Sequence, residues 1–171
     1  MLINKACPLV LRQHHNAKGQ HLEILAFRHP LAGLQLVKGT IEPDELPAHA
    51  ALRELREEAG IEARVISHLG TQIIEATGQS WHFYCCAATS MLPDQWQFYT
   101  QDDGGHCFEF FWHSLDSDMS QQSTFCLMDR LIESGQANDY WHPMFQQALL
   151  FLQQRLTLIS LNELDKNFSD Q

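Results

Sequence analysis

Residues 39–61, GTIEPDELPAHAALRELREEAGI, combine an apolar helical pattern with an unusual concentration of acidic side chains. Leu52, Leu55 and Ala59 recur at the spacing of one helix face, which predicts a helix over residues 47–59. The same short stretch holds six of the 21 Asp and Glu residues of the chain. Its acidic residues must therefore be explained together with the helix.

Three of these acidic residues, Glu54, Glu57 and Glu58, share one side of the predicted helix, about 120° from the apolar stripe. Like charges three and four residues apart repel each other. A divalent cation such as Mg²⁺ or Mn²⁺ would relieve this repulsion, because hard cations bind carboxylate and backbone carbonyl oxygens. Gly39 has no side chain and lets a carbonyl approach such an ion. The alternative is a solvated acidic face in which Arg53 pairs with Glu57.

The fixed positions of the stretch distinguish these two interpretations. Nine positions match the signature called the Nudix box: Gly39, Glu45, Arg53, Glu54, Leu55, Glu57, Glu58, Gly60 and Ile61. In a chain of this size such a match arises by chance on the order of once in ten million. The chain therefore resembles the Nudix hydrolase superfamily, with no subfamily assigned.

The resemblance implies an α/β fold, a Nudix-type α/β/α sandwich with a mixed β-sheet. We expect it to form a single domain over residues 1–158, followed by a polar tail at 159–171. The implied activity is metal-dependent hydrolysis of a pyrophosphate linkage in a nucleoside diphosphate derivative, a nucleotide or dinucleoside polyphosphate, with Mg²⁺ or Mn²⁺. The alternative is a Nudix-like domain that senses a nucleotide without cutting it. Such a domain could lose the box glutamates, and this chain keeps all of them.

The resemblance also assigns roles within the box. The implied metal ligands are Glu54, Glu57, Glu58 and the backbone carbonyl of Gly39. Glu57 or Glu58 is expected to accept the proton of the attacking water. Glu45 and Arg53 are expected to support the loop and the helix.

A further metal ligand in many Nudix enzymes lies on a later strand, shortly before a tryptophan. Glu109, three residues before Trp112, occupies such a position, and strand alternation turns it away from its phenylalanine neighbours. A solvent-exposed strand position explains Glu109 equally well. Asp102 and Asp103 could supply a mobile base, or could simply favour a turn.

Composition limits the kinds of partner. The formal net charge is −10, which argues against binding to long nucleic acids. A small nucleotide remains compatible, and Arg28 and Lys38 are candidates for contacting its phosphates. Five scattered cysteines without a CxxC pair suggest reduced thiols and a cytoplasmic protein. No apolar run is long enough to cross a membrane, and a homodimer is an assembly common among the proteins that the chain resembles.

The order of the predicted elements agrees with a sheet covered by helices. Strands are expected at residues 6–13, 21–30, 34–39, 64–77, 80–90 and 107–115, and two more helices at residues 121–134 and 143–156.

Three departures from family patterns are visible. Val37 stands where many members have a proline before the lysine–glycine pair. Leu46 stands where family members often have a serine that caps the box helix. Ala76 and Thr77 occupy the region where ADP-ribose hydrolases often have a proline. The sequence does not distinguish among nucleoside triphosphates, dinucleoside polyphosphates and nucleotide sugars as the substrate.

Overall fold

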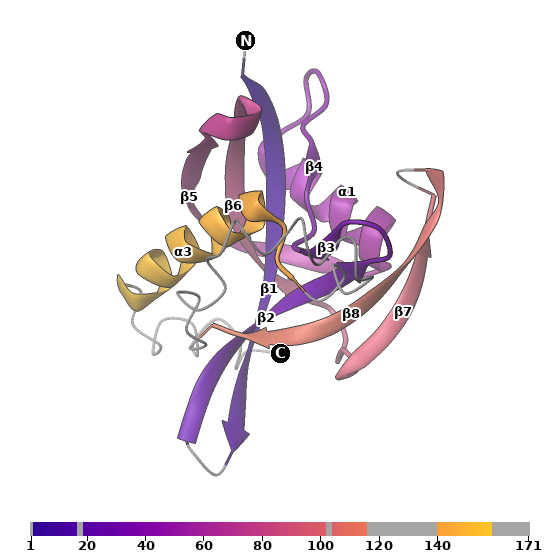
Figure 1. Ribbon diagram of the computed structural model, residues 1–171, viewed down its shortest axis with the longest axis vertical. Coiled ribbons are helices and arrows are strands. Elements are labelled where there is room, and N and C mark those ends of the chain that lie inside the picture. Colours follow the sequence, from indigo (N-terminus) through magenta and orange to yellow (C-terminus); the bar gives the residue numbers. More distant parts are fainter. Residues whose placement is uncertain (1, 17–18, 102–103, 116–139, 159–171) are drawn as a thin grey trace.

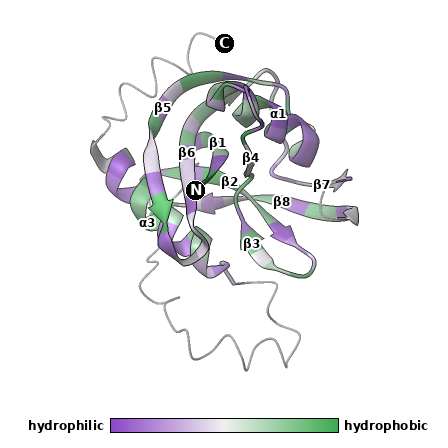
Figure 2. Ribbon diagram, turned by 90° about the horizontal axis from the view of Figure 1, so that it is seen from above, coloured by the Kyte–Doolittle hydropathy of each residue, from purple (hydrophilic) through white to green (hydrophobic). Residues whose placement is uncertain are grey.

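The computed structural model describes residues 2–16, 19–101, 104–115 and 140–158. A twisted β-sheet lies between helices α1 and α3 (Figures 1 and 2). In chain order the elements are β1 (Ile3–Asn16), β2 (Gly19–His29), β3 (Gly33–Gln35), β4 (Gly39–Thr40), α1 (Pro47–Ala59), β5 (Ala63–Ile74), the short 3₁₀ helix η1 (Glu75–Thr77), β6 (Gln79–Ala88), β7 (Gln95–Thr100), β8 (His106–Ser114) and α3 (Pro143–Leu158).

Strand β1 joins the two halves of the sheet, whose order is β5-β6-β1-β2-β8-β7. Residues 3–10 of β1 pair in parallel with β6, and residues 11–16 pair antiparallel with β2. The sheet is therefore mixed. Strand β3 adds to β2, and the two-residue strand β4 adds to the beginning of β1.

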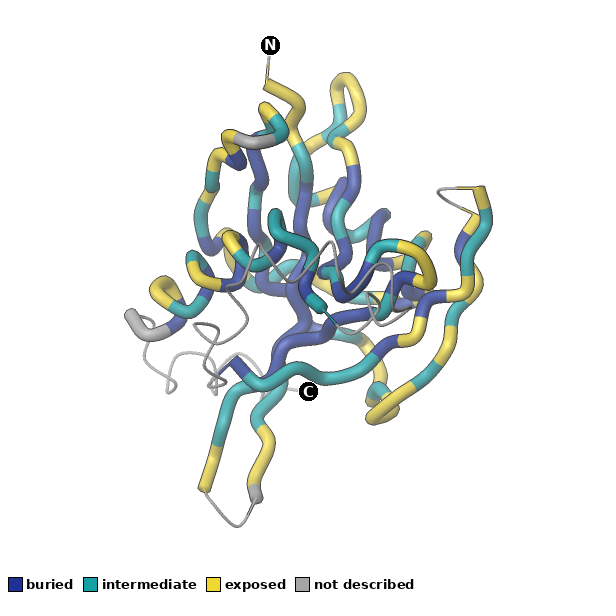
Figure 3. The backbone as a smooth tube through the Cα atoms, viewed as in Figure 1, coloured by how far each residue is buried: buried dark blue, intermediate teal, exposed yellow. Residues whose placement is uncertain are grey.

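Alternation along the strands divides the core into two layers. On one face Trp81 and Phe83 are fully buried and face the rings of Phe145 and Phe151 of α3, with ring centroids 5.1 and 5.3 Å apart. On the other face Leu55 of α1 packs in a cluster with side chains of β1, β2 and β8. Buried residues are concentrated along the central strands β1, β2 and β6 (Figure 3). No helix in the described part of the chain is long and apolar enough to cross a membrane.

The two predicted helices that fall on described residues are confirmed. Helix α1 spans residues 47–59, as its apolar stripe predicts, and α3 extends the predicted 143–156 by two residues. The predicted helix at 121–134 and the polar tail at 159–171 lie outside the described residues.

The prediction of one strand over residues 34–39 is wrong. The chain pairs with β2 at Gly33–Gln35 and then with β1 at Gly39–Thr40, so it crosses between two partners and the strand is interrupted. The predicted strand at 64–77 ends at Ile74, where η1 begins. Strand β7 was not predicted, although Trp96, Phe98 and Thr100 do alternate with more exposed residues.

The two ends of α1 differ in how well they are capped. Gly60 ends the helix with a left-handed φ of 67°. Its N–H donates to the carbonyl of Arg56, and the N–H of Ile61 donates to the carbonyl of Leu55, both at 3.1 Å. A Cβ at Gly60 would lie 2.5 Å from the ring of Phe98, so both conformation and space require glycine there. At the other end Leu46 makes no side-chain cap hydrogen bond.

Replacing Leu46 by serine should therefore raise the free energy of unfolding by about 1 kcal/mol, because a hydroxyl can accept a bond from a first-turn N–H. Leu46 is 60% exposed, so little apolar burial is lost. Urea denaturation measures the change. The control is Met91→Ser, an equally apolar-to-polar change at an exposed loop position. Equal effects of the two substitutions would contradict the capping argument.

Candidate active site

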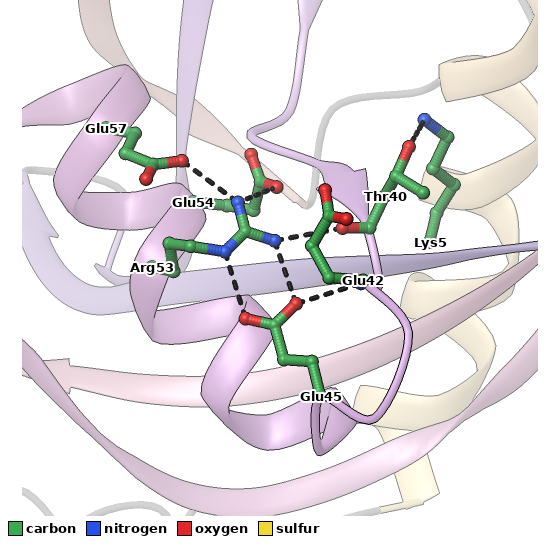
Figure 4. A network of polar contacts seen from close by, with 7 residues as sticks. All are labelled: Lys5, Thr40, Glu42, Glu45, Arg53, Glu54 and Glu57. Carbon is green, nitrogen blue, oxygen red and sulfur yellow. Dashed lines mark hydrogen bonds and ion pairs between the residues drawn. The ribbon is translucent and has the colours of Figure 1, made fainter.

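Arg53 of α1 ties the loop after β4 to the helix (Figure 4). Its Nε and Nη2 donate to the two carboxylate oxygens of Glu45 at 2.9 and 3.0 Å, and Nη2 also donates to the carbonyl of Thr40 at 2.9 Å. Its Nη1 donates to Glu54 at 2.7 Å and to Glu57 at 2.9 Å. One guanidinium thus holds the strand end, the loop and two carboxylates of the helix.

The charges of this network stabilise one another. Hydrogen bonding to Glu45, above all, raises the pKa of Arg53, and the hydrogen bonds from Arg53 lower the pKa of the Glu45 carboxyl. Glu45 also accepts a bond from the N–H of Glu42 at 3.0 Å, which closes the loop on itself. The geometry places Glu45 and Arg53 where they fix the loop against the helix.

Glu54, Glu57 and Glu58 line a single cleft of about 490 Å³, which we call the box cleft. Their exposure differs along the helix face: Glu54 is 4% exposed, Glu58 is half-buried and the Glu57 side chain is 47% exposed. Gly39 lies directly against Glu54, since a Cβ at position 39 would be 1.7 Å from the carboxylate. Only glycine lets β4 approach the buried carboxylate this closely.

The donor atoms in the box cleft suit a hard divalent cation. Three carboxylates stand on one face of α1, beside the backbone of a glycine. In the arrangement of the described residues, no three His, Cys, Asp or Glu side chains are gathered as a metal site. Glu54 and Glu57 instead share Nη1 of Arg53. The residues fit Mg²⁺ or Mn²⁺ in chemistry, and binding requires these two side chains to turn toward the ion.

The structure does not bring Glu109 or Arg28 to the box carboxylates. The two lie together in a second pocket of about 380 Å³, where Arg28 Nη1 is 2.8 Å from Glu109 Oε2. Gln97 also donates to Glu109, at 3.2 Å. Phe108 lines the box cleft, so alternation along β8 turns Glu109 to the opposite face of the sheet. Lys38, by contrast, does line the box cleft.

Lys5 also lines the box cleft, and sequence analysis missed it. Its Nζ donates to Thr40 Oγ1 at 2.6 Å, a contact between residues 35 positions apart that depends on the pairing of β1 with β4. In the sequence, Lys5 is only a lysine ahead of an apolar strand, and nothing there indicates that it lines a cleft. Asp102 and Asp103, the candidates for a mobile base, lie outside the described residues.

Comparison with known protein families agrees with the box and the fold. The model of the NUDIX domain matches residues 9–123, more than half of the chain. The chain belongs to the NUDIX family. This confirms the resemblance to the Nudix superfamily that the box residues indicated. No curated protein sequence matches the chain.

Solved Nudix structures share the fold at low sequence identity. The Nudix hydrolase RenU from M. smegmatis is 16% identical over 92% of this chain and 88% of that chain, with a TM-score of 0.53. An ADP-ribose pyrophosphatase from Streptococcus suis is 13% identical over 82% of this chain and 97% of that chain, with a TM-score of 0.51. The chain spans less than two thirds (63%) of a mutT/nudix family protein from Listeria innocua, with 49% of this chain covered, 15% identity and a TM-score of 0.42. The first two confirm the predicted α/β/α sandwich with a mixed sheet.

The pairing of Glu45 with Arg53 predicts a pH-dependent contribution to stability. Glu45→Gln should lower the free energy of unfolding by about 1–3 kcal/mol at pH 7, because it weakens charge-assisted hydrogen bonds. The folded-state pKa of Glu45 is lowered, so this contribution is present above the unfolded value of about 4.3 and is lost as the pH falls through the folded pKa.

Urea denaturation of wild type and Glu45→Gln between pH 3.5 and 7 measures the difference. The control is Glu62→Gln, whose ion pair with Arg56 at 2.8 Å is exposed on both sides and should contribute little. A Glu45→Gln deficit that is the same at both ends of the pH range would contradict the assignment.

Proposed function

We propose that the box cleft is the active site of a Mg²⁺- or Mn²⁺-dependent enzyme that cleaves a pyrophosphate linkage in a nucleotide or dinucleoside polyphosphate. One observation carries the proposal. Three carboxylates on one face of α1 share a cleft with a glycine backbone and with two lysines, Lys5 and Lys38. This arrangement offers oxygen ligands to a cation and positive charge to phosphates in one place.

Glu54, Glu57, Glu58 and the carbonyl oxygen of Gly39 are the proposed ligands. A divalent ion held there neutralises phosphate oxygens and lowers the pKa of bound water. Glu54 is buried against Gly39, whereas Glu57 reaches solvent. Glu57 or Glu58 is the proposed acceptor for the proton of the attacking water.

Arg53 has a positioning role in this proposal. It neutralises part of the carboxylate repulsion before ligands arrive, through its contacts with Glu54 and Glu57. Its bidentate pair with Glu45 uses other N–H groups. This pair keeps the loop in place when the contacts with Glu54 and Glu57 break. The loop and helix can therefore stay docked while the carboxylates turn to an ion.

As a metal ligand, Glu109 stays a prediction, since it lies with Arg28 on the other face of the sheet. The substitution Glu109→Gln tests it directly. If Glu109 binds the catalytic metal, the variant should require more Mg²⁺ for half-maximal activity; if it only pairs with Arg28, the requirement should not change.

The activity itself is tested by measuring product release from a panel of nucleoside triphosphates, dinucleoside polyphosphates and nucleotide sugars, with Mg²⁺ or Mn²⁺. Glu58→Gln should lower kcat by about 10²-fold or more, because it removes a ligand and a candidate base. Glu62→Gln makes the same chemical change at an exposed residue outside the cleft and should leave kcat unchanged.

Two results would contradict the hydrolase proposal. One is turnover that is equally fast without a divalent ion or in Glu58→Gln. The other is a panel in which no compound is hydrolysed while one raises the melting temperature, which would support the nucleotide-sensing alternative.

Gly39→Ala tests the close approach of β4 to Glu54. The added methyl group collides with the Glu54 carboxylate, which lies at the end of a flexible side chain and must move. We expect a small loss of stability and a large loss of the Mn²⁺-dependent rise in melting temperature, measured by thermal unfolding with and without Mn²⁺.

The matched control is the same substitution in a Glu54→Ala background. With the collision partner removed, Gly39→Ala should have almost no further effect on melting temperature. An equal loss of stability in both backgrounds would show that Gly39 is needed for a reason other than its contact with Glu54.

A further inference from the structure

Two lysines of the box cleft form no ion pair with any residue that the structure describes. The sequence has four lysines, and Lys5 and Lys38 are the two that the structure describes. Both line the cleft, and within the described residues neither ammonium group forms an ion pair. Unpaired ammonium groups are unexpected in a chain with 21 acidic and 11 basic residues. Their position in the cleft indicates an anionic ligand.

Each lysine is held in place by contacts with neutral groups. Lys5 Nζ donates to Thr40 Oγ1 at 2.6 Å, which leaves two of its three N–H donors for other partners. Lys38 Nζ lies 5.6 Å from the ring centroid of Trp81 and 5.5 Å from that of Phe145. Cation–π contact holds a cation without neutralising it. Both positive charges therefore remain available to a ligand.

The two lysines are close enough to influence each other and the carboxylates. Burial is the largest cause that lowers the pKa of Lys5, and the positive charge of Lys38 is the second. Glu54 and Glu58 act on the pKa of Lys5 in the opposite direction. Lys5 thus faces a second ammonium group and two proposed metal ligands in the same cleft.

Strand β4 separates the two signs of charge. Gly39 abuts the carboxylate of Glu54, whereas Thr40, the next residue, pairs with Lys5 of β1 and accepts its hydrogen bond. The carboxylates on the α1 side suit a cation and the phosphates that it binds. Lys5 on β1 and Lys38, whose ammonium group lies near the rings of Trp81 and Phe145, suit a phosphate that needs other counter-charges.

We propose that Lys5 and Lys38 form a subsite for a phosphate outside the cleaved linkage, so that the enzyme prefers substrates with three or more phosphates over those with two. This inference rests on the proposed function of the box cleft. A two-phosphate substrate, such as a nucleotide sugar, places its phosphates on both sides of the cleaved bond and leaves the lysine pair unmatched. Lys5 precedes residues 9–123, so the family match does not include it.

The test compares kcat/KM for matched compounds: a nucleoside triphosphate with its diphosphate, and a dinucleoside tetraphosphate with its diphosphate. Wild type should favour the longer chain. In Lys5→Gln and Lys38→Gln that preference should fall about tenfold, mainly through KM, because each variant loses one charge-assisted contact. Lys5→Arg keeps the charge and should retain most of the preference.

The control is Arg56→Gln, which removes one positive charge from α1 outside the cleft lining. It should leave the preference unchanged. Circular dichroism melting establishes that each variant folds, and Lys38→Gln provides an independent test if Lys5→Gln does not. An equal preference in wild type and both lysine variants overturns the subsite while leaving a Glu58-dependent hydrolase intact.

Calorimetry separates failure of the subsite from failure of the proposed function. Inorganic triphosphate should bind Glu58→Gln, and Lys5→Gln should weaken that binding about tenfold, without any need for turnover. If no compound is hydrolysed but triphosphate binding depends on Lys5, the phosphate subsite is supported and the hydrolase proposal is not. If triphosphate binds no better than inorganic phosphate, or binds independently of Lys5, the subsite is overturned.

Discussion

The geometry of the box cleft depends on the hydrogen bonds and ion pairs of the Arg53 guanidinium. Arginine offers five N–H donors in a fixed plane, and Arg53 directs them at a loop carboxylate, a strand carbonyl and two helix carboxylates. Without the positive charge of Arg53, the acidic residues of the loop and of α1 would repel one another across the cleft. Lysine could not replace it, because one ammonium group cannot form a bidentate pair with Glu45 and also reach Thr40 and Glu57.

Backbone packing sets the second constraint, at Gly39. Strand β3 pairs with β2 as far as Gln35, and pairing with β1 begins at Gly39. Strand β4 therefore has only two residues before the loop begins. This short strand passes so close to Glu54 that a side chain at position 39 fits only if the Glu54 carboxylate moves. The same pairing fixes Thr40 beside Lys5. One crossing of the backbone therefore brings the acidic and the basic halves of the cleft together.

Local features of the sequence predicted local features of the structure. The limits of α1 follow from its apolar stripe, from Pro47 and from Gly60, all within fifteen residues. The alternation of β8 likewise placed Glu109 opposite Phe108, but no local pattern tells which face of a strand borders the cleft. The division of residues 34–39 into two strands and the position of Lys5 depend on pairings between distant segments, which the periodicity of one segment does not encode.

A cleft that carries both signs of charge imposes a requirement on its ligand. The two lysines, Lys5 and Lys38, would attract a free polyphosphate, but the three carboxylates would repel it. A free cation would be attracted by the carboxylates and repelled by the lysines. A complex of a divalent ion with a polyphosphate satisfies both sets, because its positive and negative parts are bound to each other at a fixed spacing. In the proposed function a bound divalent ion would supply much of the attraction for phosphate, which is compatible with a net charge of −10 for the chain.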